Sequence, residues 1–240
     1  MKVDKYVNEL KNLGYSTVED IYSTREISSI INCIENTVVK DEDPISKNKS
    51  IYAIRQLLKV VPELKHYIFN DNLIHVLNKL YKSRYFITKA IYFDKPPKSN
   101  WFVAYHQDLS ISVNKKVELS GYQNWTYKKG QYGVQPPEEI LQNTITVRIH
   151  LDDTTKDNGA LKIIPKSHSK GIIKKESEDL NLKSETICEV RQGGIMLMKP
   201  LLFHASNKTT NNKRRRVIHL EFNNTQLQQP LEWLEFQKIN

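Results

Sequence analysis

The stretch 143-NTITVRIHLDD-153 decides the fold, because apolar and polar residues alternate along its whole length. Side chains of a β-strand point alternately to its two faces, so the pattern predicts a strand with one apolar and one polar face. The apolar face would hold Ile145, Val147, Ile149 and Leu151, and the polar face Thr144, Thr146, Arg148 and His150. We expect the apolar face to pack outward against helices and the polar face to line a barrel.

Further short strands are predicted on both sides of this stretch. Upstream, 85-YFITKAIYF-93 is aromatic and β-branched, and the prolines of 94-DKPPKSN-100 end it. Downstream, further strands are predicted within 154-TTKDNGALKIIPKSH-168, 185-ETICEVRQGGIMLMKPLLFHAS-206 and 214-RRRVIHLEF-222, with turns such as Asn158-Gly159 and Gly193-Gly194 between them. Many short strands joined by turns indicate a β-sandwich or barrel.

The first third of the chain has a different period. Three segments within residues 1–84 place apolar residues three and four positions apart, which is typical of helices. We therefore expect a single domain over 1–240. Helices at 1–84 would support a β core at 85–224, and residues 225–240 would form a C-terminal tail.

The composition is that of an ordinary soluble protein. The 240 residues suffice for one sizeable core, with 39% hydrophobic and 26% charged residues. No apolar run is long enough to span a bilayer, and the N-terminus lacks a signal-peptide core, so we expect no membrane association and a cytoplasmic location. Cys33 and Cys188 lack metal or redox spacing and are expected to be free thiols.

The net charge of +9 raises the question of nucleic acid. The lysines are scattered among acidic residues, however, and the only dense basic run is Lys213–Arg216. We expect no nucleic-acid partner. A solvated basic surface that attracts a small anionic substrate is the preferred interpretation. The oligomeric state is left open.

The strand-like stretch 101-WFVAYHQDLSISV-113 carries His106 and Asp108, which would share one face because they are two residues apart. Two histidines and one carboxylate are the ligand set of non-haem Fe(II) oxygenases. The motif alone is weak, because such a triplet also arises by chance. The other histidines compete for the third position: His66 and His75 in helices, His168 in a turn, His150 and His219 on strands, and His204 at the end of 193-GGIMLMKPLLFH-204.

Four segments together resemble one family. HQD at 106–108, DNGALKIIPKSH at 157–168, LLFHAS at 201–206 and RRRVIHLEF at 214–222 are similar to the phytanoyl-CoA dioxygenase family of Fe(II)/2-oxoglutarate-dependent oxygenases. The resemblance runs from about residue 85 to 223. It implies a mainly β fold with flanking helices, built on a double-stranded β-helix (a jelly roll of the cupin type) with an N-terminal helical region.

The resemblance also implies site residues. His106, Asp108 and His204 would bind Fe(II) and form the catalytic centre. Arg215 would pair with the distal carboxylate of 2-oxoglutarate, and Ser206 would donate a hydrogen bond to that carboxylate. O2 would be the second co-substrate.

Alternation chooses between the three arginines at 214–216. Arg214 and Arg216 share the apolar face of Ile218, Leu220 and Phe222, whereas Arg215 shares the more polar face of His219 and Glu221. Arg215 is therefore expected to face the site, and Arg214 and Arg216 to face solvent or phosphate. On its own strand Arg148 would look inward toward 2-oxoglutarate or substrate. Gln107 would lie near the co-substrate or simply pack within its strand.

Residues 114–142 look irregular but hold several aromatics, so we expect a lid or substrate loop over the barrel mouth. Trp125, Tyr127 and Tyr132 would help to form the pocket wall, or else pack within the loop. The implied reaction hydroxylates a C–H bond of a small metabolite or acyl substrate while 2-oxoglutarate becomes succinate and CO2. Asp108 favours hydroxylation, because related halogenases usually replace this carboxylate. The alternatives are a catalytically silent jelly-roll binding protein and an oxygenase acting on a macromolecule.

Overall fold

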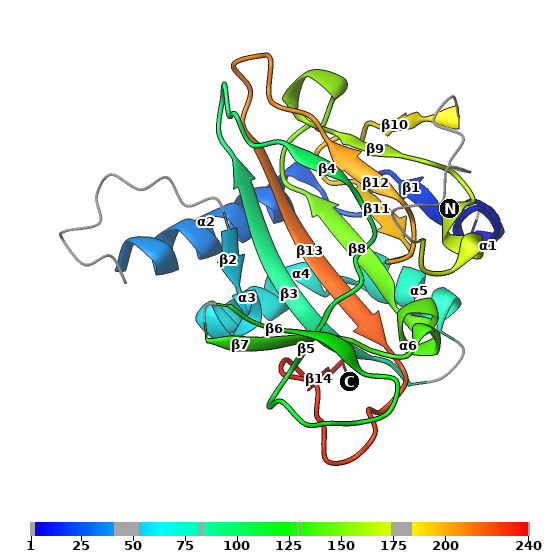
Figure 1. The fold of residues 1–240 in the computed structure, drawn as a ribbon. Helices are drawn as coiled ribbons and strands as arrows, with labels where there is room; N and C mark the ends of the chain where they lie inside the picture. Colours follow the sequence, from blue (N-terminus) through cyan, green and yellow to red (C-terminus); the bar gives the residue numbers. More distant parts are fainter. Residues whose placement is uncertain (1–2, 41–52, 82–83, 129, 174–183, 240) are drawn as a thin grey trace.

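The computed structural model describes residues 3–40, 53–81, 84–128, 130–173 and 184–239, and it is built mainly of antiparallel β-sheet (Figure 1). A large and a smaller sheet enclose a cavity between them, and a third small sheet packs at one end. Helices cover the far side of the large sheet. The predicted mainly β architecture is confirmed.

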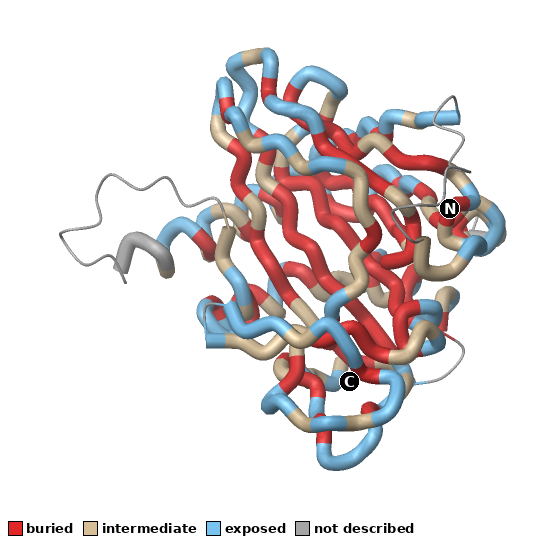
Figure 2. The backbone as a smooth tube through the Cα atoms, viewed as in Figure 1, coloured by how far each residue is buried: buried red, intermediate tan, exposed pale blue. Residues whose placement is uncertain are grey.

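The large sheet has the strand order β1-β11-β8-β13-β3-β14, with β2 also paired to β3. Its strands are β1 (Tyr15–Val18), β2 (Ala53–Arg55), β3 (Phe86–Lys95), β8 (Ile145–His150), β11 (Ile195–Met198), β13 (Arg215–Asn223) and β14 (Gln237–Lys238). The alternation along β8 is resolved as predicted: Val147 and Ile149 enter the core shared with the helices, and Arg148 points into the cavity between the sheets. Figure 2 shows the central strands as a continuous buried band.

The helices on the outer face come from the N-terminal third of the chain. They are α1 (Val3–Leu13), α2 (Thr24–Lys40), α3 (Leu57–Val60), the 3-10 helix η1 (Pro62–Leu64), α4 (Lys65–Ile68) and α5 (Asp71–Leu80). Apolar residues spaced three and four apart, such as Ile27, Ile30 and Ile34, form one stripe that packs against Leu220 and Phe222 of the sheet. The part of the chain that the structure describes contains no helix long and apolar enough to cross a membrane.

This N-terminal third is not purely helical. The sequence analysis missed β1, which extends the large sheet beside β11, and β2, which pairs with β3. Both strands are too short to show a clear period of two. Each is held by backbone pairing to a longer neighbour, which a local pattern does not reveal.

The smaller sheet has the order β10-β9-β12-β4. Its strands are β4 (Val103–His106), β9 (Leu161–Ile163), β10 (Thr186–Cys188) and β12 (His204–Ser206), with the 3-10 helices η2 (Lys156–Asn158) and η3 (Ser167–Lys170) on either side of β9. Leu161 and Ile163 pack against Met196 and Met198 of the large sheet, which closes one end of the space between the sheets. Cys188 is also buried there as a free thiol.

The segment predicted as an irregular loop contains most of a third sheet, of order β5-β7-β6. It comprises β5 (Ile111–Val113), β6 (Gln123–Lys128) and β7 (Gln131–Gln135), and is followed by α6 (Glu138–Asn143). One face of this sheet packs on the C-terminal residues Leu227, Leu231 and Trp233. The C-terminal tail is therefore part of the folded body, and it supports the third sheet from below in Figure 1.

Candidate active site

Three side chains converge where β4 and β12 meet. His106 ends β4, and its direct partner in the antiparallel ladder is His204, the first residue of β12. Asp108 Oδ1 lies 3.6 Å from Nε2 of His106, and Asp108 Oδ2 lies 3.8 Å from Nε2 of His204. One atom from each residue lies within 4.8 Å of the other two, a spacing that could hold a metal ion.

The backbone fixes which nitrogen of each histidine faces the centre. His106 Nδ1 lies 2.8 Å from the carbonyl oxygen of Ala104, and His204 Nδ1 lies 2.8 Å from that of Leu202. A carbonyl can only accept, so each Nδ1 carries the proton and each Nε2 presents a lone pair to the centre. Ligating histidines are typically held in this way by a hydrogen bond at the second ring nitrogen.

The protonation states also fit a metal. Burial lowers the pKa of His204 to about 4, so the ring is neutral at neutral pH. Burial alone would raise the pKa of Asp108, but His204 and the hydrogen bond with His106 outweigh it and hold that pKa well below its ordinary value. The hydrogen bond with Asp108 raises the pKa of His106. A carboxylate beside a neutral imidazole is the form that a divalent cation binds.

A cavity of about 210 Å³ opens from these three residues into the space between the sheets, and we call it the inner cavity. Phe93, Trp101 and Leu161 form its apolar wall. Arg148, Arg215 and Ser206 also line it.

The two arginines are buried without enough partners. Nε and Nη1 of Arg215 and Nε of Arg148 have no hydrogen-bond partner among the described residues. Burial lowers the pKa of Arg215 to about 9 and that of Arg148 to about 10, so both remain charged at neutral pH. A buried, unpaired guanidinium is costly, and a carboxylate can satisfy its planar fork. The inner cavity is therefore suited to a small carboxylate beside the metal ligands.

Lys95 is a third cation of the inner cavity, which the sequence analysis missed. Its ammonium lies 3.4 Å from Ser206 Oγ and donates to the carbonyl of Asn207. Burial, and then the charge of Arg215, lower the pKa of Lys95 to about 8. Gly159, at φ 88°, makes room for it, since a Cβ there would lie 2.6 Å from Lys95 Nζ. Lys95 shares its face of β3 with Phe93, two residues earlier, which also lines the inner cavity. Alternation along β3 was the signal for Lys95.

Two predicted co-substrate contacts are occupied by backbone groups. Ser206 Oγ donates to the carbonyl of Gly159 at 2.9 Å, so in this position it can only accept a further hydrogen bond. Gln107 donates to the carbonyls of Gly171 and Leu201, and accepts from the amide of Ile173. These bonds tie the loop after η3 to the metal-site segment, which favours the packing role for Gln107.

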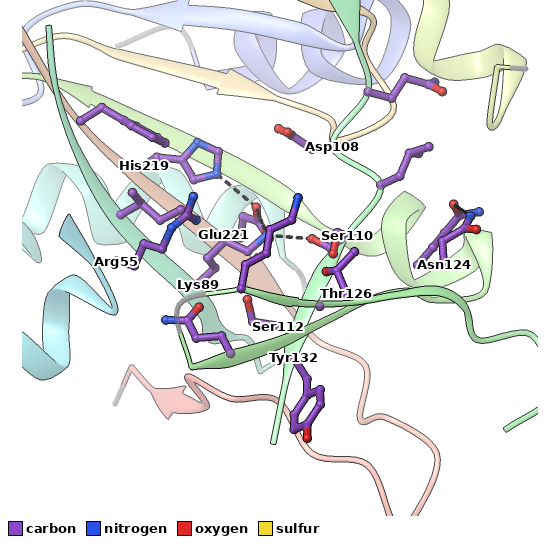
Figure 3. Close-up of a pocket in the computed structure, with 18 residues that line it drawn as sticks. Arg55, Lys89, Asp108, Ser110, Ser112, Asn124, Thr126, Tyr132, His219 and Glu221 are labelled. Carbon is purple, nitrogen blue, oxygen red and sulfur yellow. Dashed lines mark hydrogen bonds and ion pairs between the residues drawn. The ribbon is translucent and has the colours of Figure 1, made fainter. Parts of the chain in front are cut away.

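A second cavity, of about 480 Å³, lies beside the first, and we call it the outer cavity (Figure 3). Phe93, Asp108 and His219 line both cavities. The two spaces therefore meet at the metal centre, and a molecule in the outer cavity would approach that centre past Asp108.

The comparisons with known proteins agree with this geometry. A family model described as phytanoyl-CoA dioxygenase (PhyH) matches residues 10–217, which include the metal triad and most of both main sheets. The chain belongs to the phytanoyl-CoA dioxygenase family. No curated protein matches this family member significantly in sequence.

Solved structures confirm the jelly-roll fold of this dioxygenase-family chain. EctD from S. alaskensis with bound Fe superposes with a TM-score of 0.71 at 19% identity, over 94% of this chain and 79% of EctD. HygX from Streptomyces hygroscopicus with nickel and 2-oxoglutarate bound gives 0.66 at 13% identity, over 92% and 87%. SnoK, a non-haem alpha-ketoglutarate-dependent carbocyclase from nogalamycin biosynthesis, gives 0.65 at 14% identity, over 92% and 84%. At such low identities the likeness concerns the fold.

Arg215 and its two neighbours, Arg214 and Arg216, point to opposite faces of β13 in this dioxygenase-family member, as the alternation predicts. Arg215 is buried in the inner cavity. Arg214 pairs with Asp94 at 2.9 Å, and Arg216 pairs with Asp152 at 2.7 Å. The two outer arginines are thus engaged by acidic side chains of the same molecule rather than left for an external phosphate.

The three aromatics predicted for the pocket wall are placed differently. Trp125 packs in the core beneath the third sheet, and Tyr127 is 64% exposed with its ring against Tyr132. Neither Trp125 nor Tyr127 lines the inner or the outer cavity. Tyr132 borders the outer cavity, but its ring points away from Lys89 and toward the core below (Figure 3). Of these three aromatics, only Tyr132 therefore borders a cavity that meets the metal centre.

Proposed function

We propose that this chain is an Fe(II)/2-oxoglutarate-dependent dioxygenase that hydroxylates a C–H bond of a small molecule. The observation that carries the proposal is the pair of adjoining features in the inner cavity. A His-Asp-His cluster with both Nε2 atoms directed at its centre lies beside buried arginines that lack partners for some of their nitrogen atoms. The cluster matches the ligand set of non-haem Fe(II) oxygenases, and the arginines match a dicarboxylate.

Each residue would have a separate task. His106, Asp108 and His204 would hold Fe(II), which when bound with 2-oxoglutarate supplies O2 activation and the oxidation of a C–H bond. Arg215 would bind the distal carboxylate through its free Nε and Nη1. Lys95 adds a second positive charge near Arg215, so two cations would neutralise and orient the co-substrate.

Arg148 would act from the side of the inner cavity. Its Nη1 is held by His219 at 3.2 Å, and its guanidinium lies 5.9 Å above the ring of Phe93. This leaves Nε of Arg148 without a partner among the described residues, so it could donate to the co-substrate. Phe93, Trp101 and Leu161 would exclude water from the bound molecule, which strengthens its charged contacts.

Hydroxylation is preferred over halogenation because Asp108 is present and directed at both histidines. A carboxylate ligand occupies the position that a halide would need, in keeping with the resemblance described above. A small-molecule substrate is preferred over a nucleic acid because Arg214 and Arg216, the outer members of the dense basic run, are paired with acids.

The catalytically silent binding protein is the second candidate, and one experiment separates the two. Metal-free protein would be titrated anaerobically with Fe(II) and 2-oxoglutarate while the visible metal-to-ligand charge-transfer band is recorded. We expect a band that needs both additives and is absent in His204→Ala. In Arg215→Ala the band should demand about 10- to 100-fold more 2-oxoglutarate, the loss expected for one charged hydrogen-bonding group.

The matched control is His75→Ala, which removes a histidine from the outer helix α5 and should leave the band unchanged. A folded protein that gives no band under these conditions would contradict the dioxygenase proposal and favour the binding protein. Succinate formation without added substrate, measured in air, gives an independent check of turnover.

A further inference from the structure

The outer cavity is large, and its lining includes hydroxyl-bearing and positively charged side chains that the metal centre does not use. At about 30 Å³ per molecule, its 480 Å³ would hold about sixteen waters, which corresponds to a ligand the size of one or two sugar rings. Its occupant would face the metal centre through Asp108. The wall of this cavity therefore bears on the choice of substrate.

The third sheet gives that wall a polar surface. Ser112, Thr126 and Gln135 line the cavity, whereas residues of opposite parity such as Val113 and Val134 enter the core beneath. Figure 3 shows the side chains of Ser110, Ser112 and Thr126 gathered on the cavity side of the strands. A hydrocarbon chain placed here would strip water from these groups without replacing its hydrogen bonds, at a cost for each group. The wall therefore disfavours the acyl substrate and suits a molecule rich in hydroxyl or amide groups.

The charges of the cavity leave a positive surplus. Lys89 and Glu221 neutralise each other at 2.8 Å, and Asp108 is committed to the metal centre. Arg55 and Lys128 also line the cavity, and the side chain of neither makes a hydrogen bond or ion pair with any residue that the structure describes. Glu235 interacts with Arg55 through its charge. Burial raises the pKa of Glu235 to about 7, however, so its carboxyl group is only partly ionised at neutral pH and balances the charge of Arg55 only in part.

We propose that the outer cavity takes a small hydroxyl-rich anion, with its anionic group beside Arg55 and Lys128 and its hydroxyl groups on the third sheet. Hydroxyl groups match the alternating row of side-chain donors and acceptors, and one negative group matches the two free cations. The opposite end of the molecule would then face the metal centre. This inference rests on the proposed function for its role in catalysis, but the binding that it predicts does not require turnover.

Three probes with the same six-carbon skeleton separate the contributions. Gluconate has both hydroxyl groups and a negative charge, sorbitol has only the hydroxyl groups, and hexanoate has only the charge. Their dissociation constants for the metal-free protein would be measured by ligand-observed NMR. We expect gluconate to bind at least about tenfold more tightly than either of the others, a difference of about 1.4 kcal/mol.

Two double variants test where the anion binds. Arg55→Gln with Lys128→Gln should weaken gluconate about tenfold and leave sorbitol unchanged. The matched control, Arg25→Gln with Lys116→Gln, removes the same charges from exposed positions outside the cavity and should leave both probes unchanged. Equal losses in the two double variants would overturn the proposed site, because they would mean that gluconate responds only to net charge.

Other outcomes contradict the inference in distinct ways. Sorbitol binding as tightly as gluconate would remove the anionic requirement, and hexanoate binding more tightly would restore an acyl-type substrate. A charge-transfer band without any preference for gluconate would overturn this inference and leave the dioxygenase intact. A preference for gluconate without the band would support the cavity and contradict the dioxygenase.

Discussion

Nδ1 of His219 lies 3.2 Å from Nη1 of Arg148, and because a guanidinium can only donate, His219 accepts there. The proton of the ring is therefore on Nε2, which lies 3.1 Å from the carboxylate of Glu221. Glu221 in turn pairs with Lys89 at 2.8 Å (Figure 3). This chain of contacts runs from Arg148 in the inner cavity through His219, which lines both cavities, to Glu221 and Lys89 in the outer cavity.

Replacing His219 should therefore destabilise the protein in a graded way. His219→Phe leaves Arg148 and Glu221 each one partner short in a buried site, and we expect a loss of about 1–3 kcal/mol in the free energy of unfolding, measured with urea. His219→Asn offers an oxygen where Nδ1 was and should lose less. Equal stability of the two variants would contradict the hydrogen-bonding role.

Lys95 should contribute to 2-oxoglutarate binding. Lys95→Met removes the cation near Arg215 in the inner cavity, and we expect the dissociation constant of 2-oxoglutarate to rise about tenfold or more in the charge-transfer titration. The control is Lys199→Met. Lys199 has a pKa lowered by burial to about 8, as Lys95 has, but it donates to the carbonyl of Gln142 away from both cavities. If both variants weaken 2-oxoglutarate equally, Lys95 has no specific role.

Gly133 should be needed for binding in the outer cavity. A Cβ at this position would lie 2.7 Å from Oγ of Thr126 and 2.9 Å from Oγ of Ser110, so Gly133→Ala must displace two hydroxyl groups of the polar wall. We expect gluconate to bind about tenfold more weakly while 2-oxoglutarate is unaffected.

The control for this variant lies in the same hairpin. Gly130 has no atom within 4 Å of an added Cβ, but its φ is +75°, so Gly130→Ala should cost about 1 kcal/mol of stability and leave both ligands unaffected. Unchanged gluconate binding in Gly133→Ala would mean that the hydroxyl pair does not contact the ligand.

Glu235 should make stability fall as pH rises toward neutrality. Its carboxyl group is buried, it accepts from the amide of Ala90, and burial raises its pKa from 4.5 to about 7. Between these values the folded state keeps a proton that the unfolded state has released, so the free energy of unfolding decreases with pH over this interval. The loss is at most about 3 kcal/mol.

Glu235→Gln should remove this part of the pH dependence, which urea unfolding at pH 4.5 and pH 7.5 would show. Glu232→Gln, at a nearby exposed position, should leave the slope as it is in the unmodified protein. A slope that is the same in both variants would show that Glu235 ionises in the folded state as easily as in the unfolded chain.

The β8 strand and the division of the arginines could be predicted from the sequence, because a period of two is a local property that burial on one side enforces. His204 came from the resemblance. Its pairing with His106 depends on the meeting of β4 and β12, which no local pattern contains. Lys95 was overlooked because a lysine near a turn ordinarily points to solvent, whereas Gly159 makes room for it inside.

The third sheet was the least predictable part. The stretch 123–135 has polar and aromatic residues in alternation, and we expected the aromatics to form the pocket wall or else to pack within the loop. In the structure Trp125 and Tyr132 pack against a second core beneath the sheet, formed with the C-terminal residues around Trp233, while Tyr127 is exposed and Tyr132 also borders the outer cavity. That core is contributed by a distant segment, so the local alternation fixed the two faces but not their direction.

The three consecutive arginines at the start of β13 have a consequence for folding fidelity. If β13 slipped by one residue against β8 and β3, a neighbouring arginine would replace Arg215 in the inner cavity, and Arg215 would face the surface acids instead. The arginines alone therefore do not favour the correct register over the slipped one. The same slip would turn Ile218, Leu220 and Phe222 away from the helices and toward the cavities. The apolar residues of β13 therefore determine the register of the whole strand. Arg215 enters the inner cavity because Ile218, Leu220 and Phe222 can pack against the helices in only one alignment.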